Sequence, residues 1–223
     1  MYKIVKEYLK TNGMLKPVVL EEVLAPGGNE GYLLTIEGDN MVIGDYFSNH
    51  TFTVDWGDGA VLSYENEYIV THDYNTTGVY NIVIFDYVCG SLNMPNTGVI
   101  SINTAMPKVN YTDFSGMFQN CGRLATVCDD LFYNNHQAEN FGRMFLNCFS
   151  LKEIPAGLFK RCEKLTSLDG MFRNCYLITD IPHGILSQNP LIESVANMFD
   201  SCVSLQNVPS DLFYHNPLIY NFS

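Results

Sequence analysis

The sequence predicts a mostly β protein with short helical turns, in which a β-sandwich is followed by a solenoid of 27-residue coils. Two observations support this prediction: a gapless period of 27 residues in the second half of the chain, and alternating apolar and polar residues separated by tight-turn signals between positions 51 and 85. The chain has 223 residues and is 47% hydrophobic, so it can bury the cores of two modest domains.

The repeat begins at position 114 and has four copies, at about 114–140, 141–167, 168–194 and 195–221. The clearest columns are Met117, Met144, Met171 and Met198; Phe118, Phe145, Phe172 and Phe199; Cys121, Cys148, Cys175 and Cys202; and Leu124, Leu151, Ile178 and Leu205. A period of this length is typical of a solenoid, because no single coil can bury its apolar face alone.

Each coil is expected to contain two similar halves, as in residues 144–154 and 158–168. Each half combines a Phe- and Cys-bearing stretch, which we interpret as a short helical turn, with a Leu- and Ile-bearing stretch, which we interpret as a short strand. The sequence therefore predicts two short strands and two helical turns in each coil.

The chain has seven cysteines, and four of them share one column of the repeat. Cysteine behaves as a small buried apolar residue in such a position. A disulfide needs Cα atoms roughly 4.4–6.8 Å apart with suitable side-chain directions. No Cys-x-x-Cys pair with a zinc-site spacing is present. We expect reduced core cysteines, with disulfides and metal binding as the alternatives.

The stretch Asp55-Trp56-Gly57-Asp58-Gly59 lies between two alternating segments, at 51–56 and 60–64. It is either a turn or, through Asp55 and Asp58, part of a metal or catalytic site. Two carboxylates are too few for Ca²⁺, which takes about six to eight oxygen ligands. Glycine and aspartate are typical turn residues. We expect a tight hairpin turn here and a small β-sandwich around it.

Three short motifs resemble the PKD-type immunoglobulin-like domain over about residues 30–90. They are Trp56-Gly57-Asp58-Gly59, His72-x-Tyr74 and Gly78-x-Tyr80. The resemblance implies an immunoglobulin-like β-sandwich in which these motifs shape a turn and lock the strands. It also implies that calcium sites occur in some members.

The repeat pattern Met-Phe-x-x-Cys-x-x-Leu-x-x-Ile-Pro resembles the BspA-like leucine-rich repeats of bacterial surface proteins over residues 114–223. The resemblance implies a displayed adhesin and no enzymatic activity. PKD-like modules often precede this repeat type in such proteins, so the order of the two regions fits. The expected layout is an N-terminal arm and linker at 1–29, a PKD-like sandwich at 30–90, a junction and cap at 91–113, and a leucine-rich-repeat-like solenoid at 114–223.

Composition argues against several classes of partner. The net charge is −12, which repels phosphate backbones, so we expect no nucleic-acid binding. No stretch reaches the roughly 20 apolar residues that span a bilayer, so we expect no membrane insertion. The first 15 residues lack the apolar core of a signal peptide. An extracellular protein would then have lost its signal, or would leave the cell by lysis as part of a phage particle.

No sequence motif indicates an enzyme. There is no His-Glu-x-x-His, no phosphate-binding glycine loop and no Gly-x-Ser-x-Gly. The three histidines of the repeat region, His136, His183 and His215, stand in different columns. We therefore expect no catalytic residues, no metal and no cofactor.

Ligand binding is expected on the variable columns of the repeat. One column holds Phe149 and Tyr176, and another holds Tyr133, Lys160 and Tyr214; Lys152 stands in a third. Exposed aromatic rings can stack on sugars or anchor a protein partner. The alternative is that these rings only cover the edges of the coils.

The N-terminal arm is the most basic part of the acidic chain and carries Lys3, Tyr8 and Lys10. It either packs on the sandwich or docks on a partner or particle. We expect an extracellular, non-enzymatic adhesion protein of a bacterial surface that binds protein or glycan. The alternative is a bacteriophage virion component, a head decoration or fibre protein, that forms a homo-oligomer with other virion subunits and docks through the arm. The repeat starts a fifth copy at 222–223, so we expect either that the chain is truncated there or that the open end packs on another subunit, a larger particle or the terminus of the chain itself.

Overall fold

The computed structural model describes residues 10–11, 14–15, 31–45, 51–65, 69–85, 92–93 and 98–222. The strands in these residues are β1 (Lys10–Thr11), β2 (Met14–Leu15), β3 (Tyr32–Asp45), β4 (Thr51–Asp55), β5 (Val61–Glu65), β6 (Ile69–Phe85), β7 (Leu92–Asn93), β8 (Val99–Ile102) and β9 (Thr126–Val127). No helix is present among them, and the fold is mostly β, as predicted.

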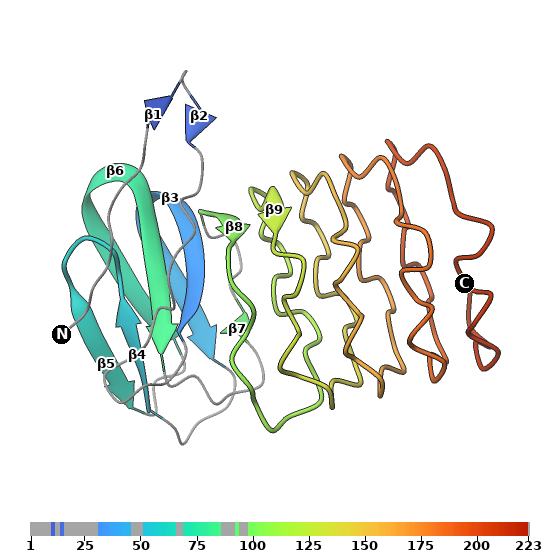
Figure 1. Cartoon of the computed structure of the whole chain (residues 1–223). Helices are drawn as coiled ribbons and strands as arrows, with labels where there is room; N and C mark the ends of the chain where they lie inside the picture. The colour runs from blue at the N-terminus through green and yellow to red at the C-terminus, as the bar shows by residue number, and fades with distance from the viewer. Residues whose placement is uncertain are drawn as a thin grey trace.

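Seven strands form one open mixed sheet in the order β5-β4-β6-β3-β8-β9, with β7 paired to β3. The long strands β3 and β6 pair antiparallel along most of their length, with a bulge between Gly38 and Asn40 (Figure 1). The alternation in β4 gives Phe52 and Val54 to the core and turns Thr51 and Thr53 outward. The described strands thus form one sheet, held together by the long pairing of β3 with β6, and the finer prediction of a sandwich of two packed sheets stays a prediction.

Strand β8 joins the sheet to the repeats. It pairs antiparallel with β3 and parallel with β9, which lies in the first repeat (Figure 1). It lies within residues 91–113, which were predicted to form the junction and cap. The main apolar cluster runs from the sheet into the repeats without a break, through Met106, Val109 and Phe114. The sheet and the segment after β8 thus cover the N-terminal end of the repeats.

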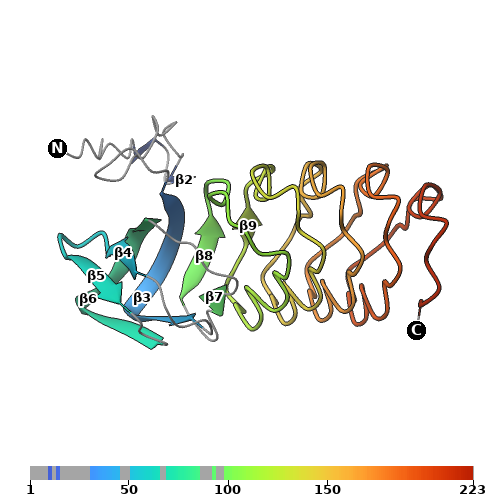
Figure 2. The same ribbon diagram turned by 90° about the horizontal axis from the view of Figure 1, so that it is seen from below.

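Residues 114–222 form a stack of coils in which each coil bonds to the next (Figures 1 and 2). The N–H of Phe118 donates to Met144 O, that of Phe145 to Met171 O and that of Phe172 to Met198 O, each at 2.9 Å. The rings of Phe118, Phe145, Phe172 and Phe199 follow the same order, with centroids 5.6, 5.7 and 5.6 Å apart and planes within 9° of parallel. The 27-residue period is therefore the spacing of layers in a continuous core.

The predicted helical turns do not form helices. Each Phe- and Cys-bearing stretch is a single hydrogen-bonded turn that does not continue. In each, the cysteine N–H donates to the carbonyl of the phenylalanine three residues earlier, as Cys148 does to Phe145 at 3.1 Å. In the first half of the coils the third residue of this turn has positive φ: Asn120, Asn147 and Asn174 have φ of 66°, 63° and 61°. Left-handed backbone stops a helix, and asparagine tolerates it better than most residues.

The predicted strands of the coils are reduced to β9 and to single bridges. The bridges link Asp113 to Asn140, Asn140 to Ser167, Ser167 to Ser194, Ser194 to Asn221 and Asp180 to Asn207. In the first coil the Cys128 N–H donates to Ile102 O at 2.9 Å beside β9. The same column holds Pro155, Pro182 and Pro209 in the later coils. Proline has no N–H, so this ladder bond cannot form there.

Half-buried asparagine side chains form hydrogen bonds across the layers. Asn147 Nδ2 donates to Asn120 Oδ1, and Asn174 Nδ2 donates to Asn147 Oδ1, both at 2.6 Å. The cysteine column is buried and forms no disulfide, as expected, and Cys148 Sγ donates to Phe118 O at 3.3 Å. Equivalent bonds of Cys175 and Cys202 are 3.2 and 3.1 Å long. Each layer is thus tied to its neighbour by apolar contacts and by repeated hydrogen bonds.

Candidate binding surface

An apolar strip lies on the outside of the stack and is called here the aromatic edge. It consists of Phe149, Tyr176, Leu177 and Val203. Phe149 is 43% exposed and Tyr176 39%, and their rings stack with centroids 5.2 Å apart and planes 15° from parallel. Leu177 and Val203 are also exposed. The structure therefore brings together two of the predicted binding residues from adjacent coils.

Stacking decides which part of these rings a ligand can contact. One face of Phe149 is covered by Tyr176. Gly122 lies close to the same ring, because a Cβ added there would meet Phe149 Cδ2 at 3.1 Å. A sugar stacks on the face of an aromatic ring, whereas a protein side chain can pack against an edge. The aromatic edge thus offers Phe149 by its ring edge, which suits an apolar protein surface better than a sugar.

The second predicted column does not form one surface. The Arg161 guanidinium lies 4.6 Å from the Tyr133 ring centroid, and its Nη2 donates to the Tyr133 hydroxyl at 3.2 Å. Lys160 is exposed, and Ser187 separates it from Tyr214 in the column. Tyr214 lies in the last coil, exposed, with its ring edge-to-face against His215. The structure therefore covers one face of Tyr133 and leaves Tyr214 apart.

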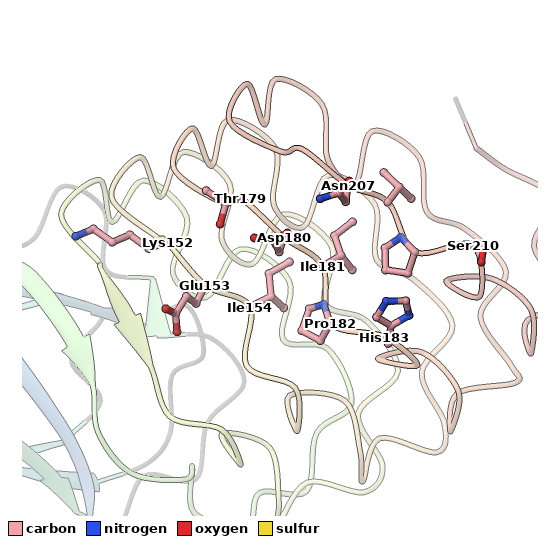
Figure 3. A pocket seen from close by; sticks show the side chains of 12 residues that line it. Lys152, Glu153, Ile154, Thr179, Asp180, Ile181, Pro182, His183, Asn207 and Ser210 are labelled. Atoms are coloured by element: carbon pink, nitrogen blue, oxygen red, sulfur yellow. The ribbon is translucent and has the colours of Figure 1, made fainter.

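A shallow open groove of about 810 Å³ crosses three coils on a different part of the stack (Figure 3). Its apolar side chains include Ile154, Ile181 and Val208, which share one column. The other residues that line it are Lys152, Glu153, Thr179, Asp180, Pro182, His183, Asn207, Pro209 and Ser210. Of the predicted binding residues only Lys152 lines it, at one end of the row.

The charges along this groove are mixed. Lys152 is followed by Glu153, and Asp180 lies on the next coil (Figure 3). His183 Nδ1 lies 3.2 Å from Asp211 Oδ1. Mixed charges on an extended, open surface suit a polypeptide with both signs of charge better than a strongly charged polymer.

The turn in the sheet region is structural, as predicted. Asp55 Oδ1 accepts the Gly57 N–H and Asp58 Oδ1 accepts the Ala60 N–H, both at 2.9 Å. Asp58 Oδ2 lies 2.8 Å from His72 Nε2. Burial opposes ionisation of Asp58, but its hydrogen bonds to Ala60 and His72 outweigh this and hold its pKa below the ordinary value. Both carboxylates are thus bonded to the protein itself.

Aromatic rings complete this turn. The His72 ring stacks on Trp56 with centroids 4.7 Å apart. The Tyr74 hydroxyl donates to Trp56 O at 2.9 Å, and its ring stacks on Tyr80 at 3.8 Å. Trp56 Nε1 donates to the Tyr64 hydroxyl at 3.2 Å. The three motifs singled out in the sequence are therefore neighbours in one packed cluster.

The thiols of Cys128, Cys162 and Cys202 are poor nucleophiles. Burial raises the pKa of Cys128 and Cys162 to about 12 and that of Cys202 to about 11. The reactive form is the thiolate, which is scarce at neutral pH with such values. In the part of the chain that the structure describes, no group of three or more His, Cys, Asp or Glu residues is placed to hold a metal ion.

The three predicted docking residues of the N-terminal arm have no described side chains, and two residues of the surfaces above were not predicted from the sequence. Lys3 and Tyr8 lie outside the described residues, and Lys10 is described only through its backbone in β1. Leu177 and His183 were not predicted. The signal for Leu177 was available, because its column holds Arg123, Ser150 and Ser204 in the other coils, so an apolar residue stands out.

No protein-family model matches the chain, and comparisons with curated proteins and with solved structures gave no match. Among the described residues no helix is long and apolar enough to cross a membrane.

Proposed function

We propose that this chain is a displayed, non-enzymatic interaction protein that binds a protein partner through the side of its stack of coils. In this proposal residues 30–90 are a PKD-like module, residues 114–223 a leucine-rich-repeat-like solenoid, and the protein acts outside the cell at a bacterial surface. The motif resemblances support the classification. The geometry of the aromatic edge supports the choice of partner.

The observation that carries the proposal is the exposed stack of Phe149 on Tyr176. Large aromatic residues on a surface are enriched at the centres of protein interfaces, where they fill pockets of the partner. Leu177 and Val203 widen the apolar area on the same side of the stack. Because Tyr176 covers one face of Phe149 and Gly122 lies close to the same ring, the geometry favours a protein over a glycan ligand.

The test is a binding screen of the full chain on immobilised glycans and on immobilised extracellular proteins. The key variant combines Phe149→Ser, Tyr176→Ser and Leu177→Ser. The matched control changes Leu62→Ser and Val79→Ser, two similarly exposed apolar residues of the sheet region. We expect binding to proteins, loss of that binding in the key variant and retention in the control. Glycan binding, or equal binding by both variants, would contradict the proposal.

The virion alternative stays a prediction. Light scattering on the full chain and on a version that lacks residues 1–24 distinguishes the two candidates. An oligomer that needs the arm favours the virion component, and a monomer in both cases favours the adhesion protein.

A further inference from the structure

The corner of the coils that carries the aromatic edge differs in charge from the rest of the stack. This corner, called here the basic corner, consists of residues 116–125, 143–152, 170–179 and 197–206. It holds one acidic residue, Asp200, and four basic residues, Arg123, Arg143, Lys152 and Arg173, so its formal net charge is +3. The other positions of residues 114–222 hold nine acidic and three basic residues, a net charge of −6. The aromatic edge therefore belongs to the positively charged part of an acidic stack.

Consecutive tight turns hold the residues of this corner together. In the second coil three N–H groups each donate, at 3.1 Å, to the carbonyl oxygen three residues earlier, namely those of Leu146, Cys148 and Leu151. Arg143 begins this run of turns and Lys152 follows it, so both lie in the same corner of the coil as Phe149. Lys152 also lines one end of the groove, but Figure 3 shows its side chain turned away from the other groove residues.

Two of the four cations have no acidic partner in the part of the chain that the structure describes. The other two form ion pairs, Arg123 with Glu37 and Arg173 with Asp200. Arg143 and Lys152 form no ion pair with a described residue, and both are exposed. They precede and follow Phe149 in the same coil, so carboxylates of a bound partner can pair with them while its apolar side chains contact the ring.

We infer that the aromatic edge binds an acidic protein surface, in which an apolar centre packs on Phe149, Tyr176 and Leu177 and surrounding carboxylates pair with Arg143 and Lys152. This inference rests on the proposed function, because it describes the partner of the same surface. Charges around an interface select the partner and speed its association. At physiological ionic strength the Debye length is about 8 Å, so a docked partner responds to these nearby cations more than to the net charge of the chain.

The experiment measures binding of a labelled acidic peptide, Glu-Asp-Leu-Phe-Glu-Leu-Phe-Asp-Glu, to the full chain by fluorescence anisotropy. A control peptide has Gln in place of Glu and Asn in place of Asp and keeps the same apolar residues. We expect saturable binding of the acidic peptide and at least about fivefold weaker binding of the control, because the control forms no ion pairs. Binding of the acidic peptide is also expected to weaken as salt is raised from about 50 to about 300 mM.

Two charge-reversed variants of the protein locate the site. Arg143→Glu with Lys152→Glu reverses the two unpaired cations and is expected to weaken binding of the acidic peptide at least about fivefold. Lys160→Glu with Lys164→Glu is the matched control, because it makes the same change in net charge at exposed positions of the same coil outside the basic corner. Its affinity for the peptide is expected to match that of the unchanged protein.

The variant that combines Phe149→Ser, Tyr176→Ser and Leu177→Ser separates this inference from the proposed function. We expect it to lose binding of the acidic peptide as well. Loss of binding only in the variant with Arg143→Glu and Lys152→Glu would support recognition of acidic groups and contradict the proposed role of the aromatic edge. Loss only in the serine variant would contradict the inference and leave the proposed function standing.

Three further results would overturn the inference. The first is no saturable binding up to about 1 mM acidic peptide, which corresponds to a negligible affinity. The second is equal binding of the acidic and the control peptide. The third is an equal loss of binding in the two charge-reversed variants, which would show that the peptide responds to the net charge of the chain and not to the basic corner.

Discussion

The sheet region and the stack of coils bury their large side chains in different ways: the first uses contacts that occur once, and the second repeats one set of contacts. Around the turn of the sheet, Trp56, His72, Tyr74 and Tyr80 are each used once, and residues up to 24 positions apart meet in one cluster. In the stack, one set of contacts recurs every 27 residues, and each layer contacts only its neighbours. A defect in the turn therefore affects a whole cluster, whereas a defect in the stack stays between adjacent coils.

This difference bears on function. A cluster built from unique residues tolerates little change, and its carboxylates and rings are committed to each other. A stack fixes its interior columns and leaves its outer columns free to vary, as Gly122, Phe149, Tyr176 and Val203 do. The stack is thus the part of the molecule on which a binding surface can be altered with little effect on the fold.

The largest expected effect separates the middle of the stack from its end. Phe145 lies between two rings and is buried, so Phe145→Ala is expected to lower the free energy of unfolding by about 3–5 kcal/mol. Phe199 has one ring neighbour and is half-buried, so Phe199→Ala is expected to cost about half as much. Urea denaturation followed by circular dichroism compares them. Equal losses would show that the last coil is covered.

The next effect concerns the join between the two regions. Cys128→Pro gives the first coil the proline of the other copies and removes the N–H that bonds Ile102 O. We expect a loss of about 1–3 kcal/mol, because a buried carbonyl loses its donor. Cys128→Ala keeps the N–H and is the control. The same denaturation experiment measures both, and a proline variant as stable as the alanine variant would show that this bond does not couple the regions.

A third prediction separates backbone strain from hydrogen bonding in the stack. Asn147→Ala removes two side-chain bonds and places alanine at φ 63°, so we expect a loss of about 2 kcal/mol. Asn147→Gly removes the same bonds but tolerates that φ, and about 1 kcal/mol of the loss should be recovered. If both variants lose the same stability, left-handed backbone is not what selects asparagine here.

The smallest expected effect is the pH dependence of the sheet region. The lowered pKa of Asp58 means that its stabilising contribution is present above the ordinary carboxyl pKa and is lost as pH falls through the folded-state value. Asp58 is largely exposed, so solvent screening keeps the effect below about 1 kcal/mol. Fluorescence of the single tryptophan, Trp56, should show a smaller acid-induced loss of stability in Asp58→Asn. An unchanged acid limb would contradict this.

Much of the stack could be predicted because its interior columns are visible in the sequence. Phe118, Phe145 and Phe172 are buried and stacked in the order that the period indicates. The turn at Asp55–Gly59 was predictable from its residue types, since Gly57 has φ 78° and both aspartates accept backbone N–H groups. In both cases the signal is local or strictly periodic.

Other features depend on contacts that no local pattern reports. The single open sheet arises from the length over which β3 and β6 pair, which is a tertiary property. The helical turns were expected from composition, but the left-handed residues that end them were not recognised. The absence of strands from the later coils could have been predicted, because the column of Pro155, Pro182 and Pro209 has no N–H to donate to a neighbouring strand. The covered faces of Phe149 and Tyr133 depend on Tyr176 and Arg161, which lie in other coils.

Residue-resolved hydrogen exchange on the full chain tests the central claim most directly: that the repeats form hydrogen-bonded layers with an open last coil. The amides of Phe118, Phe145 and Phe172 each donate to the following coil, whereas that of Phe199 has no acceptor in the described residues. We predict strong protection of the first three amides and fast exchange at Phe199. Fast exchange at all four, or protection of Phe199 equal to that of Phe172, would contradict the layered arrangement or its open end, respectively.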